Sequence, residues 1–154
     1  MSRLKKGAAV LALAVGVIGG HEGLRTKAYL DVVDVPTICY GETRGVKIGD
    51  VKTVAQCKEM LGSRLLEFEG EMRKCIRNVD ALTDGQFVAF MSLQYNIGSG
   101  AFCRSTLVRK ANEGQMIAAC NELLKWNKAG GIAWAGLTRR RKEERKLCLE
   151  GLPS

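Results

Sequence analysis

Long stretches of the chain carry apolar residues three or four positions apart, which is the spacing of one face of a helix. Thr53, followed three residues later by Gln56, predicts a capping box that opens such a helix. The helix is expected to run to about residue 76. Its apolar positions include Val54, Cys57, Met60, Leu61, Leu65, Phe68 and Met72. We interpret this stripe as the face that packs into the core.

The second half of the chain predicts a series of helices joined by short turns. Thr83 and Gln86 form a second capping-box pattern, and the helix that follows is apolar around most of its circumference, as in a buried central helix. It should end at the turn 96–100, which contains two glycines. Further helices are expected over 105–112, 115–126 and 138–150, with a loop over 126–131.

Residues 24–50 follow a different pattern. This segment is rich in Val, Tyr and Thr, and Pro36 and Gly41 punctuate it. It predicts a small antiparallel hairpin or meander, with turns also at Gly45 and Gly49. With 154 residues in total, we expect one domain or two small lobes of the α+β class, mostly helical.

The N-terminal run 7–20, GAAVLALAVGVIGG, is uncharged and follows the basic sequence MSRLKK. A basic segment followed by an apolar one is the layout of an export signal. As a helix the run would reach about 21 Å, which is shorter than the roughly 30 Å hydrocarbon core of a bilayer. Three interpretations follow: a cleaved signal peptide, a buried core helix of a cytoplasmic protein, or a weak anchor that inserts and later leaves.

The net charge of +8 suits a polyanionic partner such as nucleic acid, an anionic bilayer or an anionic cell wall. The most basic run, RRRKEERK in the last helix, is diluted by Glu143 and Glu144 and has no accompanying aromatic pattern. We interpret it as a solvated helix face, and we expect no nucleic-acid partner.

Six cysteines lie downstream of residue 38, and this even number fits disulfides formed in an oxidising compartment. Six cysteines allow 15 pairings. Proximity along the chain favours Cys39–Cys57 and Cys103–Cys120, and elimination then leaves Cys75–Cys148. The chain has no C-x-x-C pair and a single histidine, His21, so we expect no metal site.

The stretch 22–37, EGLRTKAYLDVVDVPT, holds three polar groups with a meaningful spacing: Glu22, Asp31 and Thr37. A carboxylate at a helix end that faces a carboxylate and a hydroxyl on a sheet places two acids across one site. Glycoside hydrolysis needs one carboxyl that donates a proton and one that stays ionised. By spacing alone, solvated surface residues would give the same pattern, so the surrounding sequence decides.

That surrounding sequence, E-G-x-x-x-x-A-Y-x-D-x(5)-T-x-x-x-G, resembles the active-site stretch of phage-type lysozymes, glycoside hydrolase family 24. The resemblance continues in LQYNIGSGAF (93–102), STL (105–107), WNKAGG (126–131) and GLTRRRKEER (136–145). Two positions depart from the family pattern, because Asp34 and Cys39 stand where many relatives carry glycine. Asp34 is also an alternative candidate for the second carboxylate, although the A-Y-x-D spacing favours Asp31.

The resemblance implies a mostly helical, two-lobed lysozyme-like fold. Its N-terminal lobe, to about residue 75, would hold a small three-stranded antiparallel sheet, and a helical lobe would follow over 76–154. Glu22 would be the general acid, Asp31 the second carboxylate and Thr37 the hydroxyl beside the attacking water. Tyr95 and Asn96 would hold sugar by stacking and hydrogen bonding, or else serve only packing and capping.

A protein of this family would cut the β-1,4 bond between N-acetylmuramic acid and N-acetylglucosamine in peptidoglycan, as a monomer and without a cofactor. Inverting or retaining chemistry depends on the separation of the two carboxyls. Two alternatives remain for the activity and its delivery: the same lysozyme exported by a cleaved signal peptide, and a non-enzymatic cationic protein that disrupts membranes.

The position of the apolar run points to one branch of the family. Cleavage after residue 20 would leave Glu22 on a loose chain terminus, and no A-x-A-like site is present. The overlap of apolar run and acid resembles the signal-anchor-release endolysins. The resemblance implies that residues 1–20 first tether the protein to the host inner membrane, facing the periplasm. They would then leave the membrane and refold as the first helix of the catalytic domain, 21–154, in the periplasm.

Overall fold

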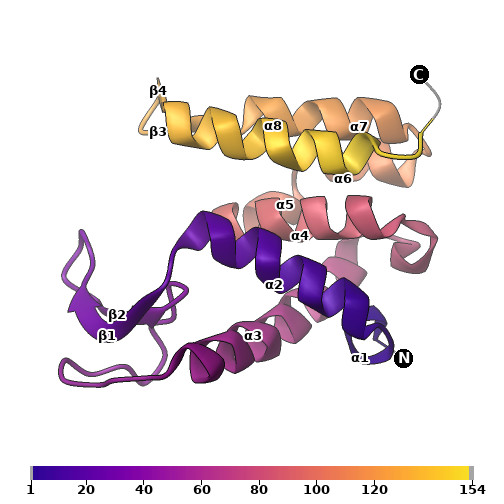
Figure 1. Cartoon of the computed structure of the whole chain (residues 1–154). Coiled ribbons are helices and arrows are strands. Elements are labelled where there is room, and N and C mark those ends of the chain that lie inside the picture. Colours follow the sequence, from indigo (N-terminus) through magenta and orange to yellow (C-terminus); the bar gives the residue numbers. More distant parts are fainter. Residues whose placement is uncertain (1, 153–154) are drawn as a thin grey trace. The chain divides into compact units, whose positions relative to one another are not determined.

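The computed structural model describes residues 2–152 and divides into two compact units, one up to Glu67 and one from Phe68 (Figure 1). The first unit begins with two helices, α1 (Arg3–Lys6) and α2 (Ala8–Glu22). The strands β1 (Arg25–Leu30) and β2 (Pro36–Cys39) follow, and then the first half of α3 (Val54–Cys75). The unit is therefore a small sheet with two longer helices.

Helix α2 packs through one side and leaves the other side open to solvent. Ala14, Ile18 and Gly19 are buried. Gly19 allows a close approach, because an added Cβ would stand 3.0 Å from Cε1 of Tyr40. The exposed positions of α2 are Ala8, Ala9, Ala12, Leu13, Gly16 and Gly20. Of the helices within residues 2–152, none is both long enough and apolar enough to cross a membrane.

The sheet of the first unit has two strands. β1 and β2 are antiparallel, with Arg25 opposite Cys39 and Tyr29 opposite Thr37. The chain that returns from β2 adds only isolated bridges, Lys27 with Val51 and Ile38 with Glu42. The prediction of a three-stranded sheet was therefore wrong. Three glycines of this return segment, Gly41, Gly45 and Gly49, have positive φ, and they keep it in turns where a third strand would have to be extended.

Two hairpin positions adopt the left-handed backbone that favours glycine. Asp34 has φ of 62° and Cys39 has φ of 61°. These are the positions that were singled out as departures from the family pattern. Asp tolerates this conformation in turns. Cys39 is held there by its disulfide with Cys57, at the end of β2 and the start of α3, and this pairing confirms the prediction.

The second unit is helical around α4 (Asp84–Ile97), whose residues 86–94 are all buried. It contains the rest of α3 and the short 3₁₀ turn η1 (Val79–Ala81). After α4 come α5 (Ser99–Cys103), α6 (Thr106–Asn112), α7 (Met116–Glu122) and the 3₁₀ turn η2 (Leu123–Lys125). The unit ends with the hairpin β3 (Lys128–Ala129) and β4 (Ile132–Ala133) and then α8 (Ala135–Leu149).

The helix starts follow the capping signals in the sequence. Thr53 and Gln56 exchange the two hydrogen bonds of a capping box at α3, and Thr83 and Gln86 do so at α4. Ser105 caps α6 by accepting from Val108 N–H. Helix α8 starts three residues before the expected 138, and the predicted loop 126–131 contains the strand β3.

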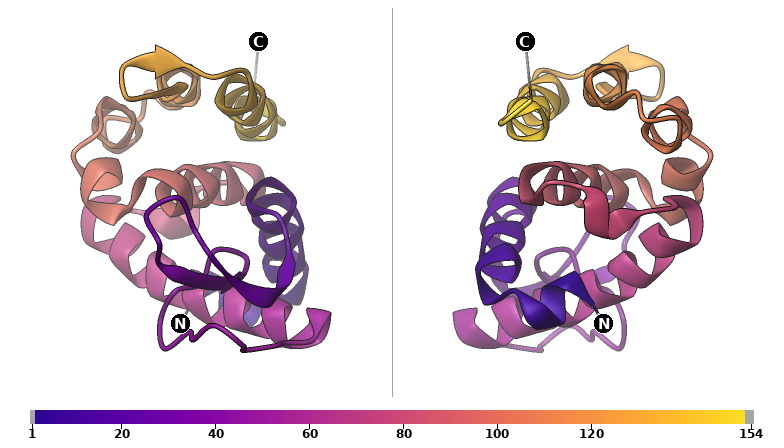
Figure 2. Two further views of the ribbon diagram at one scale, coloured as in Figure 1. Left: turned by 90° about the vertical axis from the view of Figure 1, so that its left-hand side faces the viewer. Right: turned by 90° about the vertical axis from the view of Figure 1, so that its right-hand side faces the viewer.

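The basic helix α8, seen nearly end-on in Figure 2, is not a solvated face throughout. It packs against α4. Gly85 lets the two helices approach so closely that a Cβ would overlap the carbonyl oxygen of Leu147. Arg140, Arg141 and Glu144 are buried. The expectation of a solvated RRRKEERK helix was wrong at these positions, because the charges neutralise one another in the interior: Arg141 Nε lies 2.7 Å from Glu144 Oε1.

Two of the three predicted disulfides were also wrong. Cys75 pairs with Cys103, and Cys120 pairs with Cys148. The first joins the end of α3 to α5, and the second joins α7 to α8. Proximity along the chain favoured Cys103–Cys120, but helix packing brings partners together that are 28 residues apart.

Candidate active site

The first candidate catalytic residue, Glu22, stands at the end of α2. The helix stops there because Gly23 adopts φ of 79° and donates its N–H to the carbonyl of Gly19. The Glu22 side chain is half-buried. Its Oε1 lies 3.8 Å from the point where a Cβ on Gly41 would stand, so the carboxylate lies over the turn that leaves β2. A side chain at Gly41, where φ is 84°, would also strain the backbone.

Asp31 is held by the backbone of its own turn. Its Oδ1 accepts hydrogen bonds from the N–H groups of Val33 and Val35, both at 2.9 Å. The Asp31 N–H in turn donates to the Val35 carbonyl at 3.0 Å. This arrangement is an Asx-type turn, in which the carboxylate replaces a backbone acceptor. It fixes the orientation of the carboxyl and leaves Oδ2 for other partners.

Thr37 lies on β2 with only 4% of its surface exposed. Its Oγ1 donates to the carbonyl of Val35 at 2.9 Å. Because the hydroxyl proton is used within the hairpin, the oxygen can only accept a further hydrogen bond. Val35 thus binds both residues: its N–H donates to Asp31, and its carbonyl accepts from Thr37.

The structure brings the three residues into one unit. Asp31 and Thr37 belong to the same hairpin, and a two-residue link, 23–24, joins the helix of Glu22 to β1. Two acids and one acceptor hydroxyl are therefore carried on a short helix–hairpin segment. Within residues 2–152, no group of three or more His, Cys, Asp or Glu side chains is arranged to hold a metal ion.

Tyr95 and Asn96 lie in the second unit, at the end of α4. The ring of Tyr95 packs against Phe68, with centroids 5.2 Å apart. Asn96 is exposed, and its Oδ1 accepts from Arg141 Nη1 at 3.1 Å. Arg141 is in turn bound to Glu144. Burial raises the pKa of Glu144, and attraction to Arg141 opposes that rise.

Several residues that organise the site were not identified from the sequence. Val33 and Val35 act through their backbone groups, Gly41 underlies Glu22, and Arg141 orients Asn96. The signal for the first two was available, since an Asp followed by turn residues commonly accepts backbone N–H groups two positions on. No sequence signal marks Arg141, because its partner lies 45 residues away.

These features define a mostly helical protein whose acidic residues sit on a helix end and a small hairpin. The family model for phage lysozyme matches residues 19–144. A SAR-endolysin of Bacteriophage PS119 is 40% identical over 146 residues, which cover 94% of this chain and 86% of the relative. The chain therefore belongs to the phage lysozyme family.

Solved structures agree with this assignment. A lysozyme of phage P22 matches with a TM-score of 0.82 and 34% identity, over 90% of this chain and 96% of that one. The muramidase domain of SpmX from Asticaccaulis excentricus matches with a TM-score of 0.82 and 30% identity, over 89% of this chain and 95% of that one.

Proposed function

We propose that this protein is a phage endolysin that hydrolyses the β-1,4 bond between N-acetylmuramic acid and N-acetylglucosamine in peptidoglycan. Family membership, together with a Glu at the end of α2 beside a hairpin that carries Asp31 and Thr37, supports this activity. The single observation that carries it is the position of Glu22, whose carboxylate is directed over the turn after β2 by a helix that stops at Gly23.

In this proposal Glu22 donates a proton to the leaving oxygen. Asp31, oriented by two backbone N–H groups, presents Oδ2 to the developing positive charge or to water. Thr37 donates its hydroxyl proton to the Val35 carbonyl, so its oxygen can accept a hydrogen bond from the attacking water and orient it. Tyr95 and Asn96 would contact sugar, the former by its ring and the latter through the amide N–H groups that Arg141 leaves available.

Isosteric variants test these roles. Glu22→Gln and Asp31→Asn should each lose clearing of purified peptidoglycan, the first more completely. Asp34→Asn is a matched control in the same hairpin, because Asn also tolerates positive φ there, and it should retain activity. If Asp34→Asn abolishes activity while Asp31→Asn retains it, the second carboxylate has been misassigned.

We further propose that residues 7–20 tether the newly made protein to the inner membrane and that release into the periplasm activates it. The composition of α2 supports this. A surface helix of a soluble domain normally carries polar residues on its outer face. The exposed face of α2 has only alanine, glycine and leucine from Ala8 to Gly20. Contact with the lipid bilayer before release would explain why that face lacks polar residues.

The same helix argues against a cleaved signal peptide. Ala14, Ile18 and Gly19 are buried, and Glu22 is the last residue of α2. Removal of residues 1–20 would take away this packing and leave Glu22 unsupported. The intact mass of the released, active protein tests the proposal: the full-length chain is expected, whereas a chain shortened by about 20 residues would contradict it.

A further inference from the structure

The segment 37–42 carries one part of the candidate active site and lies beneath another. Thr37, at its start, has the acceptor hydroxyl, and the Glu22 carboxylate lies over Gly41, near its end. Residues 37–40 are all buried, with 7% or less of their surface exposed. The path of the chain through these few residues therefore sets where Thr37 stands relative to Glu22.

This segment makes a tight reversal that uses left-handed backbone at two positions. Ile38 and Glu42 exchange two backbone hydrogen bonds, both at 2.9 Å, around the three residues 39–41. Within this turn, Gly41 has φ of 84° and Cys39 has φ of 61°. Glycine adopts such a conformation freely, whereas a residue with a Cβ is strained in it. Cys39 is therefore the strained position of the turn.

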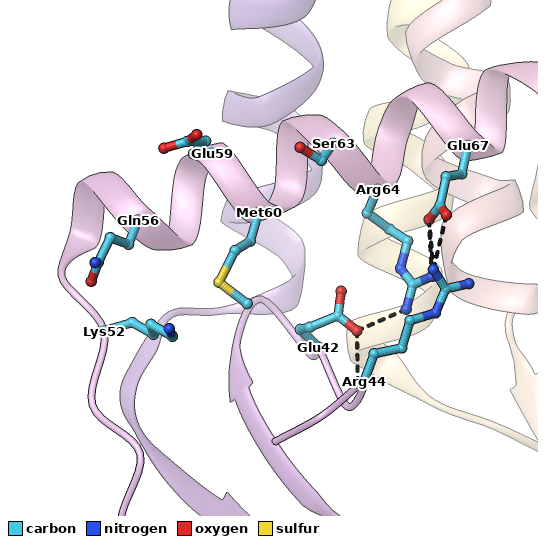
Figure 3. Close-up of a pocket in the computed structure, with 9 residues that line it drawn as sticks. All are labelled: Glu42, Arg44, Lys52, Gln56, Glu59, Met60, Ser63, Arg64 and Glu67. Atoms are coloured by element: carbon cyan, nitrogen blue, oxygen red, sulfur yellow. Dashed lines mark hydrogen bonds and ion pairs between the residues drawn. The ribbon is translucent and has the colours of Figure 1, made fainter. Parts of the chain in front are cut away.

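Helix α3 holds the turn through successive positions of one face. Cys57 forms the disulfide with Cys39, and Met60 Sδ lies 3.8 Å from Cys39 Sγ. One helical turn further on, Arg64 Nη2 donates to Glu42 Oε1 at 2.7 Å. Met60 and Arg64 both extend toward the side of α3 on which Glu42 lies (Figure 3). The disulfide is the covalent contact among these, and it acts at the strained residue itself.

Without that bond, nothing covalent opposes rotation of residue 39 toward the negative φ that a residue with a Cβ prefers. A rotation there changes the direction of the chain that follows. Thr37 would stay with β2, whereas Tyr40 and Gly41 would move with the turn. The hydroxyl and the turn beneath Glu22 would then lose their relative placement, and catalytic groups that are misplaced by about 1 Å lose much of their effect.

We infer that the Cys39–Cys57 disulfide is a positioning device of the active site, which fixes the left-handed turn and so keeps Thr37 in place relative to Glu22. The inference rests on the proposed function, which gives Glu22 the role of acid and Thr37 that of orienting the water. Both cysteines are buried, with 2% and 0% exposed, so they act through the backbone and not by touching the sugar. The bond is therefore needed for the rate of cleavage as well as for stability.

Two double variants separate the backbone conformation from the loss of the cross-link. Cys39→Ala/Cys57→Ala and Cys39→Gly/Cys57→Ala both lack the disulfide and differ only by one Cβ. The wild-type residue already has a Cβ at position 39, so alanine fits there, but it is strained at positive φ and glycine is not. On purified peptidoglycan, the alanine variant should lose kcat by roughly tenfold or more. The glycine variant should recover most of that loss, with KM unchanged in both.

Activity is expressed per folded molecule, at a temperature well below each variant's thermal melt. Should the alanine variant not fold, Cys39→Asn/Cys57→Ala replaces it. Asparagine tolerates positive φ better than alanine but less well than glycine, so its kcat should again lie below that of the glycine variant.

Cys120→Ala/Cys148→Ala is the matched control, because it removes a buried disulfide of the second unit. It should lower the melting temperature and leave kcat per folded molecule unchanged. Equal kcat in the alanine and glycine variants, or an equal loss in the control, would overturn the inference while wild-type clearing of the wall still supports the enzyme. Failure of the oxidised wild type to clear the wall would instead overturn the proposed function.

Discussion

Replacing Gly16 and Gly20 together with leucine should hold the protein in the membrane without damaging the folded enzyme. An added Cβ at either glycine meets no atom within 4 Å, and both face outward on α2. Leucine in place of glycine also favours the helix by roughly 1 kcal/mol per site. The first unit therefore accepts the leucines, whereas Gly19→Leu would collide with Tyr40.

The magnitude follows from burial. A leucine side chain moved from water to an apolar environment contributes about 1.5–3 kcal/mol, so the pair favours the inserted state by about 3–6 kcal/mol. At about 1.4 kcal/mol per factor of ten, escape from the bilayer becomes less favourable by two to four orders of magnitude. The folded state offers no equal gain, since both positions are exposed there.

Lysis of cells that express each variant is the assay, together with membrane fractionation. Gly16→Leu/Gly20→Leu should remain in the membrane fraction and lyse late, while the purified variant clears peptidoglycan as fast as wild type. Gly16→Ser/Gly20→Ser is the polar control and should lyse earlier. If the leucine variant lyses on the wild-type schedule, anchoring does not control activity and the tether proposal is wrong.

Further predictions concern stability. Gly85→Ala should destabilise the second unit by several kcal/mol through overlap with the α8 backbone. Gly70→Ala, in open space on α3, should stabilise the protein slightly. The melting temperatures of the two variants test both expectations. Hydrogen bonds from two lysines lower the pKa of Glu122 below its ordinary 4.5. The ionised carboxylate therefore stabilises the folded protein above that pH, and this contribution is lost as pH falls. The melting-temperature deficit of Glu122→Gln should therefore shrink from pH 7 to pH 3, and a constant deficit would contradict this. Loss of the Cys120–Cys148 disulfide, which closes a 28-residue separation, should cost about 3–4 kcal/mol in denaturant unfolding, and an unchanged midpoint would argue against the pairing.

Local signals in the sequence were sufficient for much of the fold. Capping boxes at Thr53 and Thr83 give two helix starts, because such caps depend on residues within three positions of one another. The Val-, Tyr- and Thr-rich pattern of residues 24–50 predicted the hairpin that carries Asp31 and Thr37. The roles of those two residues, like those of Glu22, Tyr95 and Asn96, stay predictions until the variants are assayed.

Features that depend on distant partners were missed. Arg141 and Glu144 belong to a run that predicts a solvated face, and only the packing of α8 against α4 buries them. The partners of Cys75 and Cys120 are likewise set by helix packing rather than by distance along the chain. The prediction of a third strand was wrong for a local reason, because Gly45 and its neighbouring glycines adopt positive φ. The sequence alone does not show which turn each glycine makes.

The most direct test of the account is the clearing of purified peptidoglycan by Glu22→Gln, measured beside a thermal melt. Glutamine keeps the shape of the side chain and removes the proton that the reaction needs. The account predicts a folded protein with wild-type melting temperature and wall clearing reduced by at least 100-fold, about 2.7 kcal/mol of transition-state stabilisation. A variant that clears the wall at a tenth of the wild-type rate or faster would show that Glu22 is not the acid.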